Sequence, residues 1–68
     1  MTTKTKIGRK LRKARKELEL TQAEVADKAD IHPNYYSRIE RDEVNPSLDV
    51  FEDILKALKV KSRDILNF

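Results

Sequence analysis

Asn34 and Arg38 are the side chains in this 68-residue chain best suited to specific recognition. They stand four residues apart in a segment that favours a helix, so both lie on one helical face. A guanidinium can donate to O6 and N7 of guanine together, and an amide can pair with N6 and N7 of adenine. Ser37 adds a hydroxyl that can reach a base or a phosphate. At this spacing the two side chains have the chemistry to contact base edges together from one face of a helix.

Positive charge gathers near the beginning of the sequence. Residues 1–16 hold eight basic groups and no acidic one, whereas the other 52 residues hold seven basic and twelve acidic groups. Such a basic segment attracts polyanions, although a solvated helix face would account for the same charges. Arg9, Lys10, Arg12 and Lys13 are candidates for contacts with a phosphate backbone, Arg12 foremost.

Composition narrows the class of protein. The chain has no cysteine and one histidine, so we expect no disulfide, no metal site and no cofactor. Neither a nucleophile–base pair nor a metal cluster is evident, and an enzyme is the poorest fit. No apolar run approaches the ~18 residues of a membrane span, so we expect a soluble, cytoplasmic protein. We predict one domain over residues 1–68, with residues 1–5 as a flexible basic arm.

Apolar periodicity predicts an all-α fold with five helices. Ile7, Leu11, Ala14 and Leu18 form one stripe, which predicts a helix over residues 6–18. A further helix is expected after Ser47, with a wide apolar face formed by Leu48, Phe51, Ile54, Leu55 and Leu58, and a last short helix is expected over residues 63–66. Two serines are the expected N-caps of these last two helices, Ser47 and Ser62.

Two short helices are expected between these elements. Thr21 and Glu24 have the spacing of a capping box and predict a helix from Gln22 to Ala29. Pro33 is suited to a first helical turn, and its helix should end at residue 40 or 41.

Residues 7–66 resemble the DNA-binding domain of the Cro/C1-type (Xre) repressors. The resemblance rests on residues where a helix-turn-helix needs buried side chains: Gln22, Val25, Ala26, Ala29, Ile31, Tyr36 and Ile39. It implies a compact five-helix, lambda-repressor-like domain whose second and third helices form the helix-turn-helix. Two aspartates, Asp30 and Asp42, stand where relatives often have glycine.

The resemblance also implies roles for individual residues. Asn34 and Arg38 match base-contacting positions, and Pro33, where relatives often have a polar residue, offers shape or a thymine-methyl contact. Arg15 and Glu40 match a pair that is buried beneath the DNA-facing surface in the family. The candidate base-reading residues are Pro33, Asn34, Ser37 and Arg38.

A second group of residues is expected to hold the DNA backbone. It consists of Gln22, Thr21, His32, Tyr35, Arg41, Asn45 and Arg12. His32 fits a capping or phosphate-side role better than a metal ligand, and Tyr35 can contact a phosphate, pack on a sugar or cover the following loop. Asp42 and Glu43 oppose a phosphate contact by that loop.

The function expected from the resemblance is sequence-specific binding of double-stranded DNA by a small transcription regulator, as a homodimer on an inverted repeat. The candidate dimer contacts are Val60, Ile65, Leu66 and Phe68, which could instead close the core. One alternative is an antitoxin-type module whose unknown protein partner docks on Asp49, Glu52 and Asp53. Non-specific nucleic-acid binding is another.

Overall fold

The computed structural model describes residues 7–65, and all regular structure in that range is helical. The helices are α1 (Ile7–Glu17), α2 (Gln22–Ala29), α3 (Pro33–Glu40), α4 (Leu48–Leu58) and α5 (Ser62–Ile65). The expected all-α, five-helix fold is confirmed, and the bounds of α2 and α3 agree with those predicted from the sequence.

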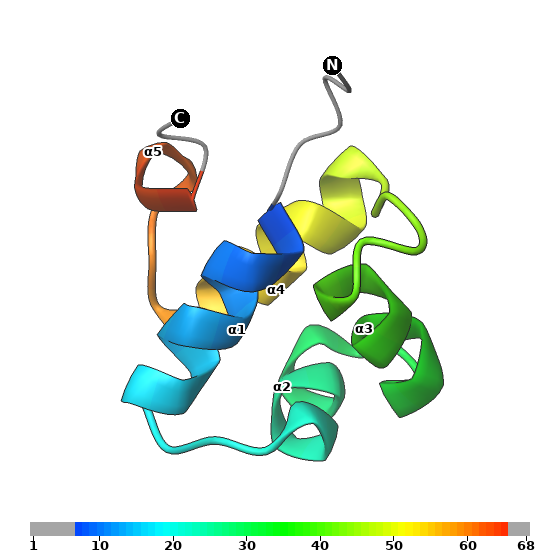
Figure 1. Cartoon of the computed structure of the whole chain (residues 1–68), viewed down its shortest axis with the longest axis horizontal. Helices are drawn as coiled ribbons and strands as arrows, with labels where there is room; N and C mark the ends of the chain where they lie inside the picture. The colour runs from blue at the N-terminus through cyan, green and yellow to red at the C-terminus, as the bar shows by residue number, and fades with distance from the viewer. Residues whose placement is uncertain (1–6, 66–68) are drawn as a thin grey trace.

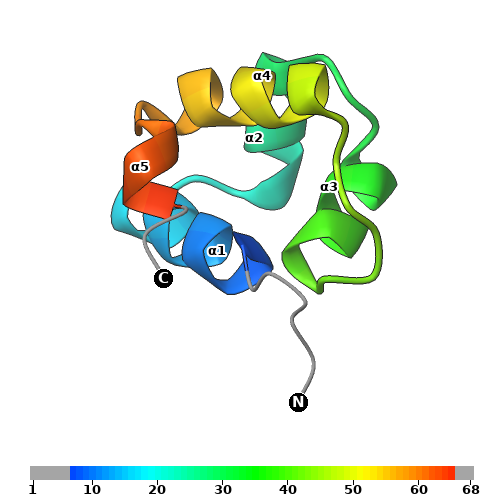
Figure 2. The ribbon, with the colours of Figure 1, turned by 90° about the horizontal axis from the view of Figure 1, so that it is seen from above.

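The helices enclose a single core. α2 packs on α3 and α4, and α1 packs on α3, α4 and α5. Figure 1 shows α2 and α3 as adjoining short helices, and Figure 2 shows α1 and α4 facing each other with α3 and α5 at opposite ends. This arrangement places one long side of α3 against the core and leaves the other side exposed.

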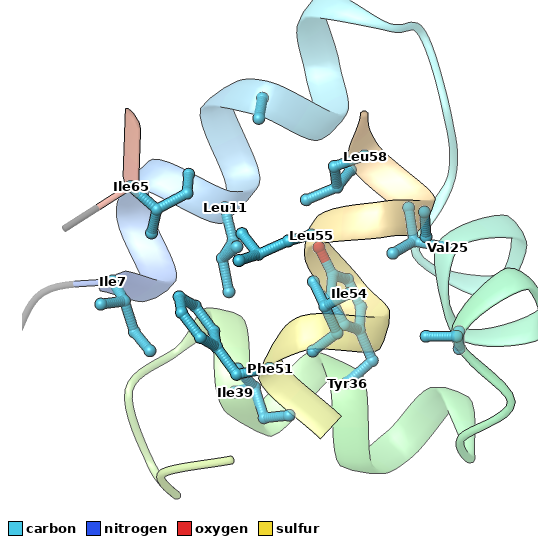
Figure 3. Packing of buried hydrophobic residues seen from close by; sticks show 14 residues of the cluster. Ile7, Leu11, Val25, Tyr36, Ile39, Phe51, Ile54, Leu55, Leu58 and Ile65 are labelled. Atoms are coloured by element: carbon cyan, nitrogen blue, oxygen red, sulfur yellow. The ribbon is translucent and has the colours of Figure 1, made fainter. Parts of the chain in front are cut away.

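Buried side chains from all five helices meet in this core (Figure 3). The largest that are fully buried are Tyr36, Leu11, Ile39, Ile54, Leu58 and Val25. Tyr36 and Ile39 come from α3, so burial of apolar area holds this helix in the domain.

Local hydrogen bonds explain where the helices begin. The capping box of α2 is present: the Thr21 hydroxyl accepts from the Glu24 N–H at 3.0 Å, and the Glu24 carboxylate accepts from the Thr21 N–H at 2.7 Å. Ser47 caps α4 by accepting from the Val50 N–H at 3.2 Å. These bonds satisfy backbone donors that have no partner within their own helix.

Three expectations about the helices are corrected. α1 ends at Glu17, so Leu18 lies in the following turn, where its side chain is 41% exposed instead of completing the apolar stripe. Leu48, the first residue of α4, is 72% exposed because it lies beyond the packed part of that helix. α5 begins at Ser62 itself, and the Asp64 carboxylate accepts from the N–H of the preceding Lys61 at 3.1 Å.

Candidate nucleic-acid interface

The turn between α2 and α3 sets the position of α3. Asp30 adopts a left-handed conformation with φ 59° and ψ 45°, as expected for a position where relatives often have glycine. The N–H of Ile31 then donates to the carbonyl of Ala26 at 2.9 Å, and Ala26 is fully buried. A small residue here lets α2 and α3 approach closely, so the start of α3 is tied to the end of α2.

An ion pair between α1 and α3 holds the other end of α3. The Arg15 Nε lies 2.7 Å from Glu40 Oε2, and its Nη2 donates to Oε1 at 3.2 Å, so the pair is bidentate. Arg15 also donates to the carbonyl of Leu20 at 2.9 Å, and Gln22 Nε2 donates to Glu40 Oε1 at 2.9 Å. The Glu40 side chain is only 2% exposed. One buried carboxylate thus joins α1, α2 and α3.

The surroundings of Glu40 favour its charged form. Burial alone would raise the pKa of Glu40, but the hydrogen bond from Arg15, the nearby polar groups of Tyr36 and Gln22 and the charge of Arg15 outweigh burial and lower it. The Tyr36 hydroxyl oxygen is buried near this pair and has no well-formed hydrogen bond within the described residues. Burial raises the pKa of Tyr36, so its phenol remains neutral. Arg15 and Glu40 are therefore the charged groups of this buried cluster, and Tyr36 is neutral.

Gly8 brings the first turn of α1 against the end of α3. A β-carbon at Gly8 would stand 2.6 Å from the carbonyl oxygen of Ile39, closer than real β-carbons approach oxygen. The Gly8 N–H donates to Asp42 Oδ1 at 3.1 Å, so an aspartate from the loop after α3 caps the start of α1. A carboxylate there also interacts favourably with the helix dipole. α1 and the end of α3 are thus joined at two places, by Arg15–Glu40 and by Gly8–Asp42.

The outer face of α3 carries the predicted reading residues. Pro33, Asn34 and Arg38 are exposed, whereas Ser37 is half-buried. Tyr35 is also half-buried and packs against the hydrophobic core. Asn34 and Arg38 are therefore presented to the outside by a helix whose other face is fixed in the core.

Glu43 links the charged residues at the end of this face. Its Oε2 lies 2.7 Å from Arg41 Nε, and its Oε1 lies 3.6 Å from Arg38 Nε. Arg41 also donates from Nη1 to the Ser37 hydroxyl at 3.1 Å. These contacts lower the pKa of Glu43, first through the hydrogen bond from Arg41. Two residues predicted to contact DNA thus share one carboxylate in the free protein.

The remaining backbone candidates lie at the helix starts and on α1. Thr21 is exposed at the start of α2, Asn45 is exposed in the loop before α4, and Arg12 is exposed on α1. His32 is the N-cap of α3: its Nδ1 accepts from the Asn34 N–H at 3.1 Å. The described residues contain no group of His, Cys, Asp and Glu side chains arranged to hold a metal ion. No helix in the same range is long and apolar enough to cross a membrane.

Comparison with known proteins agrees with this geometry. A family model described as Helix-turn-helix matches residues 11–65, which include all of α2, α3 and α4. The chain belongs to the helix-turn-helix family. The resemblance to Cro/C1-type repressors seen in the sequence is confirmed. This helix-turn-helix chain is 42% identical over 63 residues to the control protein C.BamHI of Bacillus amyloliquefaciens. The aligned residues cover 91% of this chain and 78% of C.BamHI.

Two further relatives are longer than this chain. The immunity repressor protein of Bacillus phage phi105 is 40% identical over 55 residues, covering 81% of the chain and 38% of the repressor. The HTH-type transcriptional regulator SinR of Bacillus licheniformis is 36% identical over 62 residues, covering 90% of the chain and 56% of SinR. The helix-turn-helix chain therefore spans about two fifths to four fifths of the length of these relatives.

A solved structure has the same helix-turn-helix fold. The crystal structure of the restriction-modification controller protein C.AhdI from Aeromonas hydrophila matches with a TM-score of 0.85 at 28% identity. The match covers 90% of this chain and 92% of the other. The agreement extends over almost the whole fold, well beyond the two helices of the motif.

One predicted dimer contact is corrected in the helix-turn-helix structure. Ile65 is 3% exposed and belongs to the core, so its side chain has almost no area to offer a partner. Val60 is partly buried against the core and keeps some exposed area. The other two candidates, Leu66 and Phe68, lie outside the described residues, as do residues 1–5.

Sequence reasoning missed two residues of this helix-turn-helix site, the buried Gly8 and the exposed Glu43. Gly8 is the only glycine of the chain, and an isolated glycine within a helical pattern is a known sign of close packing. Glu43 was seen only as a charge opposed to DNA, because its spacing from Arg38 and Arg41 does not show which side chains reach each other across a loop.

Proposed function

We propose that this helix-turn-helix protein regulates transcription by binding a specific double-stranded DNA sequence. In the proposal, α3 enters the major groove, which is ~12 Å wide, and Asn34 and Arg38 contact base edges. The names of the relatives, a phage repressor and a control protein among them, support a regulatory role.

One observation carries the proposal: Asn34 and Arg38 are exposed on a helix that α1 and α2 hold in place. Tyr36 and Ile39 anchor α3 in the core, and Glu40 binds α1 and α2. A helix that recognises a DNA sequence needs such support, because a bidentate contact discriminates between bases only when the side chain is held at a fixed position.

Phosphate contacts supply the rest of the proposed interface. Gln22 uses Nε2 to bind Glu40, and the amide has a second N–H that can donate to a phosphate. It would thus join the DNA backbone directly to the buried pair. The other proposed backbone residues are Thr21, His32, Tyr35, Arg41, Asn45 and Arg12, and Pro33 and Ser37 would lie near the bases. Backbone contacts fix the register, whereas base contacts select the sequence.

Two copies of the chain are needed for useful selectivity, because one recognition helix covers few base pairs. We propose a two-fold dimer on an inverted repeat, with recognition helices about 34 Å apart. The proposed contacts are Val60, on the exposed area it retains, together with Leu66 and Phe68.

The test is selection of bound duplexes from a random library at ~150 mM salt. Enrichment of an inverted repeat with half-sites about ten base pairs apart would support a dimeric regulator. An Arg38→Ala protein selected in parallel should lose preference at one position in each half-site. Absence of any enriched sequence for the unmodified protein would refute sequence-specific binding.

A second function is favoured by the surface of α4. Asp49, Glu52 and Asp53 are all exposed there, and the neighbouring Leu48 is 72% exposed. An apolar side chain among acidic ones is suited to a basic protein partner. Reversing the charges of Glu52 and Asp53 should then abolish regulation of an operator-linked reporter while leaving DNA binding unchanged. Equal regulation by the altered and unmodified proteins would argue against such a partner.

A further inference from the structure

The carboxylate of Glu43 lies among residues that the proposed function places on DNA. It forms a tight contact with Arg41, with Oε2 2.7 Å from Nε, and its Oε1 is 3.6 Å from Arg38 Nε. The side chains involved are about half exposed: 54% for Arg38, 58% for Arg41 and 47% for Glu43. All three are therefore accessible to a ligand that approaches α3.

The two arginines use different atoms in these contacts. Arg41 engages three donors within the protein: Nε and Nη2 bind Glu43, and Nη1 binds the Ser37 hydroxyl. Arg38 approaches Glu43 less closely: its Nε lies 3.6 Å from Oε1, an ion-pair distance and not a hydrogen bond. Among residues 7–65, Nη1 and Nη2 of Arg38 make no hydrogen bond comparable to those of Arg41. These two terminal groups are the pair that a guanidinium can direct end-on at O6 and N7 of guanine.

We propose that Glu43 is a specificity-determining residue that acts through Arg38. It holds the Nε edge of Arg38 so that both terminal nitrogens face the base, and its charge repels phosphates so that binding without a base contact is weak. This inference rests on the proposed function, since it concerns how the same face selects its sequence.

Counterion release gives the size of the expected repulsion. Each phosphate that a protein neutralises adds about 0.9 to the slope of log K against log salt. At ~0.15 M salt that slope corresponds to roughly a fivefold gain in affinity per added contact. If Glu43 cancels about one such contact, its neutralisation should strengthen binding to an arbitrary duplex by roughly fivefold.

The experiment compares dissociation constants for the selected duplex and for a shuffled duplex over a range of salt concentrations. Glu43→Gln removes the charge, and Glu43→Asp keeps the charge but shortens the reach to Arg38. Asp27→Asn, at an exposed position on α2, is the matched control for loss of one carboxylate. Glu43→Gln is also combined with Arg38→Ala to show whether the effect passes through Arg38.

The proposal expects Glu43→Gln to bind the shuffled duplex roughly fivefold more tightly, with a salt slope steeper by about one. The affinity for the selected duplex should rise less than that for the shuffled duplex. The ratio of the dissociation constant for the shuffled duplex to that for the selected duplex therefore falls. Glu43→Asp should weaken binding of the selected duplex only, and Asp27→Asn should leave the ratio unchanged. Once Arg38 is alanine, Glu43→Gln should no longer alter the ratio.

Two results would overturn the inference while leaving the proposed function intact. One is an unchanged ratio for Glu43→Gln in a protein that still discriminates between the duplexes. The other is an equal fall in the ratio with and without Arg38, which would mean that Glu43 does not act through that residue. Equal affinity of the unmodified protein for both duplexes would instead refute sequence-specific binding, and the role of Glu43 with it.

Discussion

Replacing Glu40 with glutamine tests the brace beneath the reading helix. The substitution keeps the shape but leaves the Arg15 guanidinium, whose side chain is 12% exposed, without a charged partner. Breaking a buried pair costs ~3–5 kcal/mol. We expect about 3 kcal/mol, the lower end of that range, because Arg15 keeps its bond to the Leu20 carbonyl. A domain of this size has ~3–10 kcal/mol in total, so the loss would be a large fraction.

The free energy of unfolding is measured by urea unfolding at pH 7, followed by circular dichroism. In a thermal unfolding experiment at the same pH, Tm should fall by ~12–24 °C. Glu52→Gln on the exposed face of α4 is the control and should change the free energy of unfolding by less than ~0.5 kcal/mol. Tyr36→Phe removes a hydroxyl that lies near the Glu40 carboxylate without a well-formed hydrogen bond, so it should cost less than Glu40→Gln. A loss below ~0.5 kcal/mol for Glu40→Gln would refute the reasoning, since the pair would then contribute no more than an exposed one.

The same variant predicts how stability depends on pH. The pKa of Glu40 is lowered in the folded protein, so its contribution is complete above the unfolded value of ~4.3. The contribution is lost as the pH falls through the folded pKa. The difference in stability between the unmodified protein and Glu40→Gln should therefore be constant from pH 7 to about pH 5 and shrink below about pH 4. A difference that widened toward low pH would show that the pKa shift has the opposite sign.

Three further substitutions test the structure and the proposed contacts. Gly8→Ala should lower the free energy of unfolding by ~1–3 kcal/mol despite the better helix propensity of alanine, because the new methyl group would meet the end of α3; a rise in Tm would contradict this. Asp30→Gly should raise the free energy of unfolding by up to ~1 kcal/mol, because glycine adopts the left-handed conformation without strain. Asp42→Gly should raise it less, because the substitution also removes the acceptor of the Gly8 N–H. Equal gains would show that this hydrogen bond contributes nothing. Arg38→Ala should cost ~1–3 kcal/mol of discrimination at one base pair, and Gln22→Ala should weaken binding to all duplexes alike, both measured by competition with a panel of single-base variants; uniform weakening by Arg38→Ala would contradict base reading.

Local signals allowed much of the fold to be predicted from the sequence. The capping box at Thr21 and Glu24 marks the start of α2, and Pro33 marks the start of α3. Both are short-range features, decided by hydrogen bonds and dihedral angles within a few residues. The exposure of Leu18 and Leu48 was not predictable in this way, because periodicity shows which side of a helix is apolar but not how far the core extends along it.

The residues of the candidate site were partly predictable from the sequence, but their contacts between helices were less so. Helical spacing placed Asn34 and Arg38 on one face, and the resemblance to Cro/C1-type repressors suggested Arg15 and Glu40 as partners, which the structure brings to 2.7 Å. The contact of Gly8 with the end of α3 depends on the distance between two helices, and no feature of the sequence specifies that distance.

Three carboxylates at the end of α3 explain how an acidic segment can belong to a surface that binds a polyanion. Glu40 binds Arg15, Asp42 accepts from the Gly8 N–H, and Glu43 lies between two arginines of the reading face. The first two fix this segment to α1, so Glu43 is the most exposed of the three carboxylates beside the proposed DNA-binding face. A count of acidic residues treats the three as equal, whereas their partners give two of them a structural role and leave one to influence binding. The electrostatics of this face therefore depend on which side chains reach each other, and in the loop after α3 the fold decides that.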